Sequence, residues 1–394
     1  MKLLTISTLF PNSVEEKHGI FVETRLKHLV QKYPDIEHTV IAPVPWFPFE
    51  SSIFPQYSKY SKVPDIEVRN DVTIYHPRYL VIPKIGMTVT PHTLAFAIER
   101  QLLRLMHSGH SFDLIDGHYY YPDGVAIEKV ASKLKIPFTV TARGTDINLI
   151  PEYEKPKQQI INVMNKANHN LAVCEALRQE MITIGAKPET VTTLRNGVDL
   201  SLFSFYDESK QLILRNKLDL PANVPLLMSV GFLIERKGHH LIIEALLNHP
   251  TAYLVIAGTG PDLHKLQEQV VELKLGKRVL FVGGLPQEQL SEYYGAADAL
   301  ILASSREGWA NVLLEAMASG TPVVATNVWG TPEVVASPIA GVLVDRDSES
   351  ISEGISDVLN SSYSRLQTRQ YAEKFNWDET SDGQYQLFTK LINS

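Results

Sequence analysis

The chain has 394 residues, which is more than one ordinary hydrophobic core accommodates and predicts two domains. Its hydrophobic content of 44% and charged content of 21% are typical of a globular protein, and its net charge of −7 argues against nucleic-acid partners. Cys174 is the single cysteine, which excludes a disulfide framework or a cysteine zinc site within one chain. No apolar run reaches the roughly 18–20 residues of a membrane span. Pro11 interrupts the apolar N-terminus, so we interpret it as a first strand rather than a signal peptide and expect a cytoplasmic protein.

In the first half of the chain, short β-rich runs alternate with segments of helical periodicity. The expected strands are 2–7, 39–42, 112–116, 137–141, 171–173 and 190–194. The expected helices are 20–32, 123–134, 157–166 and 175–184. This alternation predicts a parallel sheet with helices on both faces.

The segment 42–60, APVPWFPFESSIFPQYSKY, follows no period and carries four prolines and six aromatic residues. A loop of this length in a compact domain is often functional. It is either an ordered loop packed onto the sheet by its own aromatic side chains or a contact with an acceptor or a membrane surface. The sequence leaves both interpretations open.

The same alternation restarts after a linker near 198–209. A helix is expected at 237–247, and the expected strands are 225–230, 253–257, 279–282, 299–302, 322–325 and 341–344. The pattern therefore predicts two Rossmann-like α/β halves.

Two adjacent cations, Arg236 and Lys237, follow the expected strand 225–230 and open a helix. In open parallel sheets, ligands bind outside the carboxyl ends of the strands. Two cations at a helix N-terminus oppose the positive end of the helix dipole, and a bound anion removes that conflict. Together with backbone N–H groups they suit a diphosphate. The alternative is a pair of solvated surface cations.

Two glutamates, Glu307 and Glu315, stand eight positions apart around a helix start that we expect near Ala310 or Asn311. Eight helical residues span about 12 Å, which is comparable to the distance from a ribose across a diphosphate to a donor sugar. A carboxylate is repelled by the diphosphate, so each glutamate is expected to bind hydroxyl groups. The alternative is a helix with one capping and one exposed glutamate.

Further candidates stand at the ends of other expected strands. The turn at 258–261 permits a close backbone approach to a phosphate or a base, although it lacks the full dinucleotide-binding glycine pattern. His118 is either a catalytic or a structural histidine. Arg143 and Asp146 either contact a ligand or simply pair with each other. The candidates in the first half are Gly19, His118, Arg143, Asp146 and Asn196.

Taken together, these motifs resemble the nucleotide-sugar glycosyltransferases of family 4, and the resemblance covers essentially the whole chain. Its most specific part is EGWANVLLEAMASGTPVVAT at 307–326, which is similar to the family's Glu–(seven residues)–Glu signature and the strand that follows. The elements RKG, AGTGP, FVGGLP, NGVD and HGIFVETRLKHL match the family in order and spacing.

The resemblance implies the GT-B fold, in which two Rossmann-like α/β domains face each other across a cleft. The N-terminal domain, 1–203, is expected to bind the acceptor. The C-terminal domain, 204–375, is expected to bind the nucleotide-sugar donor. The final helix, 376–394, is expected to cross back and pack on the N-terminal domain.

The resemblance also implies a role for each candidate residue. Glu315 is expected to hold the ribose hydroxyls and Glu307 the hydroxyls of the donor sugar, while the two cations neutralise the diphosphate. The implied catalytic residues are Glu307, His118, Lys237 and Arg236. The implied donor-binding residues are Gly19, Arg236, Lys237, Gly260, Gly284, Leu285, Glu307, Gly308, Asn311, Val312 and Glu315. The implied acceptor-side residues are Arg143, Asp146 and Asn196, and His118 is expected to face the reacting sugar.

The chain departs from the family pattern at two places. Many members have Gly-Arg after the first strand of the second half, whereas this chain has Gly231 and Phe232, so Arg236 is expected to replace the missing cation. Many members have His-Gly-x-Asp where this chain has Arg143, which is expected to meet an anionic acceptor.

The implied reaction is a retaining, hexosyltransferase-type transfer from a nucleoside-diphosphate sugar to an acceptor hydroxyl. A UDP-sugar is the favoured donor and GDP-mannose the alternative. No cofactor or metal ion is expected, because the basic pair and a helix dipole stabilise the leaving group. Closure of the two domains over the donor is expected. Two other functions stay open: a nucleotide-sugar epimerase on the same fold, and a non-catalytic nucleotide-sugar-binding subunit.

The expected acceptor is a glycan or a lipid-linked sugar in bacterial surface polysaccharide biosynthesis. Peripheral contact with the cytoplasmic face of the inner membrane is expected from two groups of residues, and the alternative for the second group is the solvated face of a helix. The first group is Trp46, Phe47, Phe49 and Phe54, and the second is Arg25, Lys27, His28 and Lys32.

Overall fold

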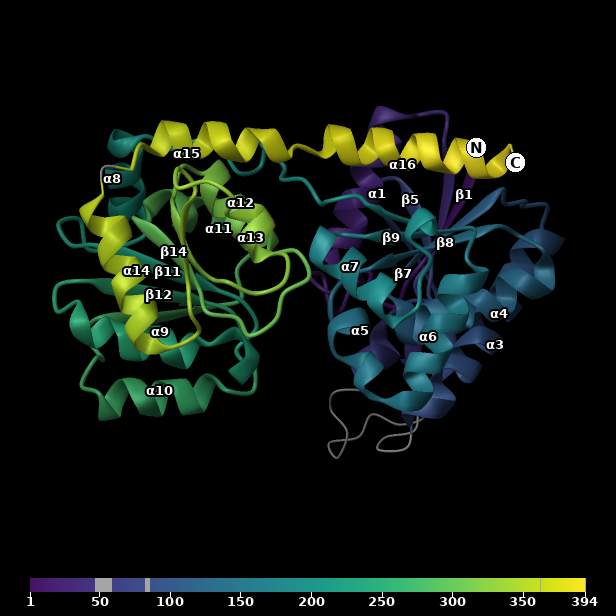
Figure 1. Ribbon diagram of the computed structural model, residues 1–394, viewed down its shortest axis with the longest axis horizontal. Coiled ribbons are helices and arrows are strands. Elements are labelled where there is room, and N and C mark those ends of the chain that lie inside the picture. The colour runs from purple at the N-terminus through teal and green to yellow at the C-terminus, as the bar shows by residue number, and fades with distance from the viewer. Residues whose placement is uncertain (47–58, 82–85, 362, 394) are drawn as a thin grey trace. The chain divides into compact units, whose positions relative to one another are not determined.

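The computed structural model describes residues 1–46, 59–81, 86–361 and 363–393. It divides into two compact units (Figure 1): the N-terminal domain, Met1–Arg195 with Asp378–Ser394, and the C-terminal domain, Asn196–Trp377. The chain therefore changes domain at 195/196 and 377/378, where the sequence predicted 203/204 and 375/376. The last helix belongs to the N-terminal domain.

The N-terminal domain is built on an eight-stranded sheet in the order β10-β9-β8-β7-β1-β2-β5-β4, in which only the edge strand β4 is antiparallel to its neighbour. A small second sheet pairs β3 with β6. The strands are β1 (Lys2–Ile6), β2 (Glu37–Ile41), β3 (Val44–Trp46), β4 (Ile66–Arg69), β5 (Val72–Tyr75), β6 (Arg78–Leu80), β7 (Leu114–His118), β8 (Phe138–Ala142), β9 (His169–Ala172) and β10 (Val191–Thr193). The strand order reverses between β1 and β7, so the loops after these two strands diverge at a point where open α/β sheets bind ligands.

Helices cover both faces of this sheet. The helices of the domain are α1 (Ile20–Lys32), α3 (Gly86–His107), α4 (Val125–Leu134), α5 (Thr145–Asn148), α6 (Glu154–Lys166), α7 (Glu175–Ile184) and α16 (Trp377–Ile392). On one face, Leu26 and Leu29 of α1 and Phe388 of α16 share a core with Leu3 and Leu114 of the sheet. Helices α3, α4 and α6 pack against one another on the other face.

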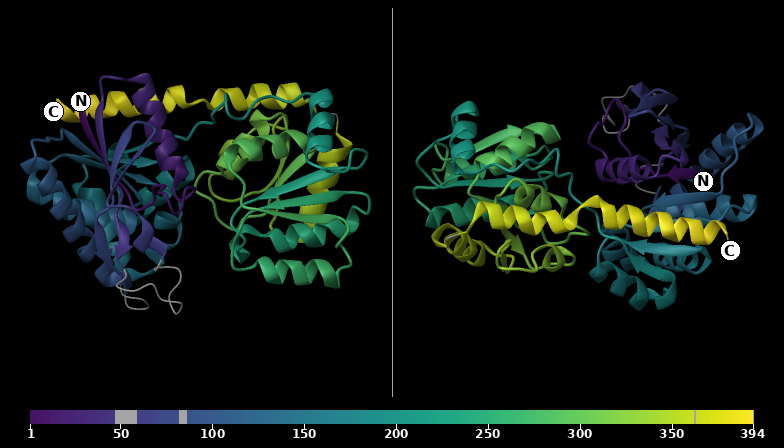
Figure 2. Two further views of the ribbon diagram at one scale, coloured as in Figure 1. Left: turned by 180° about the vertical axis from the view of Figure 1, so that it is seen from behind. Right: turned by 90° about the horizontal axis from the view of Figure 1, so that it is seen from above.

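Helix α16 lies beside α1, as Figures 1 and 2 show, and two of the α1 cations, Arg25 and Lys32, contact it. The expected membrane contact of these cations stays a prediction. Arg25 is only 1% exposed and its Nε donates to Gln384 Oε1 at 3.0 Å. Lys32 forms ion pairs with Asp378 (3.1 Å) and Asp382 (2.6 Å). These side chains attach the last helix to the domain.

The C-terminal domain contains a six-stranded parallel sheet in the order β13-β12-β11-β14-β15-β16. The strands are β11 (Leu226–Val230), β12 (Tyr253–Ala257), β13 (Val279–Gly283), β14 (Ala299–Leu302), β15 (Val323–Thr326) and β16 (Gly341–Val344). The helices are α8 (Glu208–Lys217), α9 (His239–Ala245), α10 (Leu263–Glu272), α11 (Gln287–Ala296), α12 (Asn311–Ala318), α13 (Thr331–Val334), α14 (Ser348–Asn360) and α15 (Arg365–Ala372). This is the doubly wound order, and it reverses between β11 and β14.

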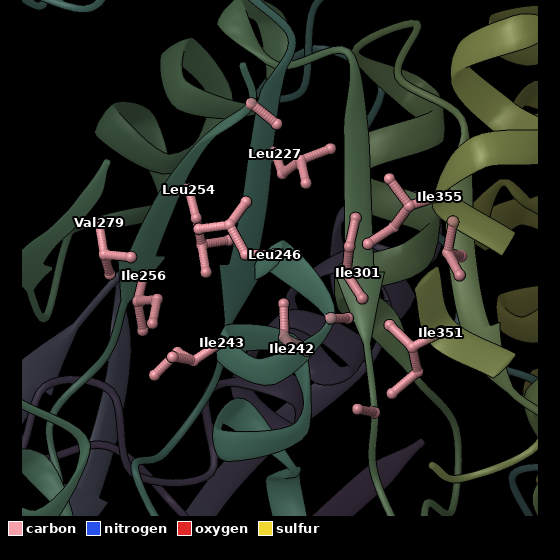
Figure 3. Packing of buried hydrophobic residues seen from close by; sticks show 14 of the residues in the cluster. Leu227, Ile242, Ile243, Leu246, Leu254, Ile256, Val279, Ile301, Ile351 and Ile355 are labelled. Atoms are coloured by element: carbon pink, nitrogen blue, oxygen red, sulfur yellow. The ribbon is translucent and has the colours of Figure 1, made fainter. Parts of the chain in front are cut away.

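The strands of this sheet are apolar on both faces because helices cover both. Figure 3 shows Leu227, Leu254 and Ile301 of the sheet packed against Ile242 of α9 and Ile355 of α14. The neighbouring positions along the strands point to the opposite face, where Leu226 and Val255 pack against residues of α8 and α11. The predicted sheets with helices on both faces are confirmed in both domains.

The predicted aromatic contact segment lies mostly outside the described residues. Phe47, Phe49 and Phe54 all belong to 47–58, whereas Trp46 ends β3 and is 46% exposed. Among the residues that the structure describes, no helix is both long and apolar enough to span a membrane.

We expect Phe388→Ala to destabilise the N-terminal domain by about 3–5 kcal/mol, because a buried aromatic ring leaves a cavity when it is removed. Phe388 is fully buried among side chains of β1, β7 and α1. Denaturant unfolding of the full chain measures the change. Gln386→Ala, at an exposed position of the same helix, should stay within about 0.5 kcal/mol of wild type. Equal effects of the two substitutions would contradict the assignment of α16 to this core.

Candidate active site

In the C-terminal domain, the predicted cations and one predicted glutamate meet where the strand order reverses. Arg236 and Lys237 lie in a 3-10 turn after β11, and Glu307 lies in the loop after β14. Strands β11 and β14 are hydrogen-bonded neighbours in the sheet. Their connections leave in opposite directions, which opens the space that ligands of such sheets occupy.

Lys237 and Glu307 form a hydrogen-bonded ion pair between these two loops. Lys237 Nζ donates to Glu307 Oε1, and Ser304 Oγ donates to the same oxygen at 2.6 Å. The two charged side chains are only 16% and 11% exposed. Burial raises the pKa of Glu307, but Lys237, Ser304 and Arg236 outweigh it and hold that pKa below its ordinary value. Glu307 is therefore an anion at neutral pH, with hydroxyl groups as its natural ligands.

The turn that carries the two cations is fixed to the end of β14. Arg236 Nη1 donates to the carbonyl of Arg306 at 2.6 Å, and the Ser305 N–H donates to the Arg236 carbonyl at 2.8 Å. Gly238 closes the turn with a φ of +70°, and a Cβ there would lie 2.1 Å from the Ala303 carbonyl oxygen. A glycine is therefore required for the basic turn to approach β14 this closely.

Glu315 lies inside α12 in a different environment. Its Oε2 accepts a hydrogen bond from the Tyr294 hydroxyl of α11 at 2.9 Å. Burial raises the pKa of Glu315 to about 7, although the Tyr294 hydrogen bond acts in the opposite direction. This carboxyl group therefore changes its charge close to neutral pH.

Helix α12 begins at Asn311, within the predicted range. In the described part of the chain, no side chain caps its N-terminus. The Asn311 N–H donates to the Trp309 carbonyl at 3.0 Å, Val312 follows in the first turn, and Gly308 is buried just before it. Asn196, expected on the acceptor side, lies instead in the C-terminal domain, where its Nδ2 donates to Asn311 Oδ1 at 3.4 Å.

The remaining donor-side candidates lie in the loops after β12 and β13. The loop containing Gly260 packs on the loop after β11, because the Leu233 N–H donates to the Thr259 carbonyl at 2.8 Å. Gly284 and Leu285 directly follow β13, the edge strand beside β12. Phe232, which stands where many relatives have arginine, is 53% exposed.

In the N-terminal domain, His118 ends β7 and is only 1% exposed. Its Nδ1 accepts a hydrogen bond from Arg143 Nη2 at 2.6 Å, and its Nε2 lies 3.3 Å from Asp116 Oδ2. Burial lowers the pKa of His118 to about 4, because it outweighs the attraction of Asp116. His118 is thus a neutral ring with both nitrogens bonded inside the domain.

Asp146 and Gly19 shape the loops around His118. Asp146 is fully buried and accepts hydrogen bonds from the backbone N–H groups of Tyr120 (2.9 Å), Arg143 (3.0 Å) and Gly144 (2.8 Å). The predicted Arg143–Asp146 contact therefore runs through the backbone of Arg143. Gly19 precedes α1 with a φ of +67°, and a Cβ there would lie 2.2 Å from the Leu9 carbonyl carbon.

Four residues of these clusters were not among the predicted site residues. Two of them could have been found from the sequence: Ser304 stands three positions before Glu307, and Asp116 is a carboxylate within an apolar strand. Tyr294 and Gln384 could not have been found from the sequence, because their partners Glu315 and Asp116 lie on other elements that only the fold brings close. Among the described residues, no group of three or more His, Cys, Asp or Glu side chains could hold a metal ion.

Comparisons with known proteins agree with this architecture. The family description "Glycosyltransferase Family 4" matches residues 22–202, and "Glycosyl transferases group 1" matches residues 210–375. The putative teichuronic acid biosynthesis glycosyltransferase TuaC of Bacillus subtilis strain 168 is 29% identical over 361 residues, which cover 90% of this chain and 88% of that protein.

Two solved structures show the same fold over the whole chain. Sucrose-phosphate synthase from Thermosynechococcus elongatus superposes with a TM-score of 0.80 at 21% identity, covering 100% of this chain and 99% of that one. Anabaena Alr3699/HepE in complex with UDP-glucose superposes with a TM-score of 0.73 at 19% identity, covering 99% and 100%. With the two family models matching almost all of the sequence, the chain belongs to glycosyltransferase family 4 and is a glycosyltransferase with the GT-B fold.

Proposed function

We propose that the enzyme transfers a sugar, with retention of anomeric configuration, from a UDP-sugar to a hydroxyl group of a glycan or lipid-linked acceptor. The observation that carries this proposal is the meeting of Arg236, Lys237 and the ionised Glu307 where the strand order of the C-terminal domain reverses. Two cations suit the diphosphate, and an anionic carboxylate beside them suits the hydroxyls of the sugar that moves.

The chemical step follows from the charge that develops on the leaving nucleoside diphosphate. Arg236 and Lys237 stabilise that charge in the transition state, and the N-terminus of α12 adds the positive end of its dipole. We propose that the reaction needs no divalent ion, because these cations neutralise the diphosphate. In the proposed front-face transfer, the leaving phosphate oxygen accepts the proton of the attacking hydroxyl while the bond to the sugar breaks. Loss of activity in EDTA would contradict the metal-independent step.

The donor assignment rests on the loops around β11 to β14. Glu315 accepts hydrogen bonds from the ribose hydroxyls, and the backbone at Gly284 and Leu285 contacts the base, with Gly260 beside it. Uridine is favoured because the structure of Anabaena Alr3699/HepE, which shares the fold, is a complex with UDP-glucose. GDP-mannose is the alternative donor.

The acceptor assignment rests on the N-terminal domain. Burial and the charge of Arg25 lower the pKa of Arg143 to about 9, although Asp116 and Asp146 act in the opposite direction. The oxygens of Asp146 are engaged by backbone N–H groups. An acceptor with a phosphate or carboxylate group would relieve this excess of positive charge. The relative named for teichuronic acid biosynthesis supports a role in bacterial surface polysaccharide assembly.

A thermal-shift screen against UDP, GDP and their sugars tests the donor, followed by transfer assays with the donor that binds. A ligand at 100 times its dissociation constant stabilises the protein by about 2.7 kcal/mol. We expect stabilisation by UDP and UDP-sugars and transfer only when an acceptor is present. Conversion of the UDP-sugar without an acceptor would indicate an epimerase. Binding without hydrolysis or transfer would indicate a non-catalytic subunit.

We expect Lys237→Ala and Glu307→Gln each to lower the rate of UDP release by about 10²–10³-fold, the usual cost of removing one preorganised electrostatic contact. A coupled assay for UDP measures kcat. Lys265→Ala, at an exposed position of α10, removes the same charge elsewhere in the domain and should leave kcat unchanged. Wild-type rates in either site variant would contradict the donor site.

We expect UDP-glucose to bind about tenfold more tightly at pH 8 than at pH 6. The carboxylate form of Glu315 accepts two ribose hydroxyls, and the ionised fraction of a group with a pKa of about 7 rises about tenfold over that interval. Titration calorimetry measures the affinity, and the diphosphate of UDP-glucose keeps its charge throughout.

Glu315→Gln should abolish this pH dependence, whereas Glu268→Gln on the exposed face of α10 should preserve it. A wild-type affinity that is the same at both pH values would show that Glu315 does not bind the donor as a carboxylate.

A further inference from the structure

Gln384 of α16 is a buried amide at the strand ends of the N-terminal domain, and it is only 1% exposed. Its Oε1 accepts from Arg25 Nε at 3.0 Å, and its Nε2 donates to Asp116 Oδ2 at 3.0 Å. An arginine can only donate and an ionised aspartate can only accept, so these neighbours fix which end of the amide faces which.

The same directional bonding continues from Asp116 to His118. Asp116 Oδ1 accepts from Thr139 Oγ1 at 3.3 Å, and Oδ2 lies 3.3 Å from His118 Nε2. Arg143 donates to His118 Nδ1, so Nδ1 carries the lone pair and the single proton of the neutral ring is on Nε2. The chain of donors and acceptors therefore selects one tautomer of His118.

Arg143 is the outer end of this chain. Gln384, Asp116 and His118 are 1%, 2% and 1% exposed, whereas Arg143 is only part-buried. Its guanidinium lies over the Phe21 ring, 5.3 Å from the centroid, and bonds to His118 at 2.6 Å. The buried part of the chain thus ends on the guanidinium of Arg143, which the loop after β8 carries.

We propose that Gln384, Asp116 and His118 are positioning residues that hold the guanidinium of Arg143 in place, which makes α16 a functional part of the acceptor-side site. The role of Arg143 toward the acceptor rests on the proposed function. The positioning itself is a property of the N-terminal domain alone. His118 connects Asp116 to Arg143, because one ring nitrogen bonds to each of them. The orientation of Asp116 therefore fixes that of the Arg143 guanidinium.

The decisive experiment is ¹⁵N NMR of the full chain labelled in histidine, with the His118 resonances assigned by His118→Asn. We expect wild type to show one fixed tautomer, protonated on Nε2. Gln384→Met removes both hydrogen bonds of the amide, and Gln384→Glu keeps its shape but replaces the donor that faces Asp116. Both substitutions leave Arg143 and Asp116 in place but remove the amide that orients Asp116, so they should shift the His118 nitrogen resonances away from their wild-type values.

Gln386→Met and Gln386→Glu are the matched controls, because Gln386 is an exposed residue of the same type on the same helix. They should leave the His118 resonances unchanged. If the Gln384 variants give the wild-type His118 spectrum, the amide does not position His118 and the proposal is overturned. Two substitutions at 384 keep the test decisive if one of them fails to fold.

Activity supplies a second readout with whichever acceptor the transfer assays identify. Gln384→Met should lower kcat/KM for the acceptor by about tenfold and leave the affinity for UDP unchanged. That factor is the one expected when a misplaced Arg143 loses one hydrogen bond to the acceptor. In an Arg143→Lys background the same substitution should cost little further activity, because both changes act through one guanidinium. Additive costs would overturn the proposal. A complete absence of transfer would count against the proposed function only, and the NMR result would still decide the positioning.

Discussion

The loop arrangement at the strand ends of the C-terminal domain depends on the ion pair between Lys237 and Glu307. A doubly wound sheet leaves a space where its strand order reverses. Here the loop after β11 carries Lys237 and the loop after β14 carries Glu307. The pair holds both loops against the end of β14, and Gly238 allows that approach because no side chain fits beside the Ala303 carbonyl. A buried pair of this kind adds little stability by itself, since desolvation offsets the attraction. Its consequence is an ordered cation beside an ordered carboxylate, which is what a diphosphate and a sugar require.

The two glutamates of the signature are chemically different despite their shared motif. Glu307 is kept ionised by three polar neighbours, whereas Glu315 has one neutral hydrogen-bond donor and a pKa near 7. Environments that push two carboxyl groups apart in pKa usually assign them different tasks. The ionised group stands with the two cations. The titrating group stands a turn inside α12, where the Tyr294 hydroxyl is its hydrogen-bond donor.

Much of the fold could be predicted because both sheets are regular βα repeats. The helices Ile20–Lys32 and Glu175–Ile184 and the strands Tyr253–Ala257 and Ala299–Leu302 have the predicted bounds. The long helix Gly86–His107 was not predicted; it contains Pro91, a residue that usually argues against a helix. Contacts such as Tyr294–Glu315 and Gln384–Asp116 join residues 21 and 268 positions apart. No local pattern encodes such pairs, so the cations and carboxylates could be predicted but not the groups that orient them.

The N-terminal domain buries the guanidinium group of Arg25 almost completely, at the contact between α1 and α16. A buried guanidinium is tolerated only when charge and hydrogen bonds surround it. Asp116 supplies the charge, while the amide of Gln384 bridges the two and leaves the aspartate free to orient His118. The bridging residue comes from the last helix, after the chain has already built the other domain. Residues 1–195 alone would therefore lack both the Phe388 side of the core and the amide that connects Arg25 to Asp116. The return of the chain thus completes both the core and the hydrogen-bonded cluster around Arg25 and Asp116.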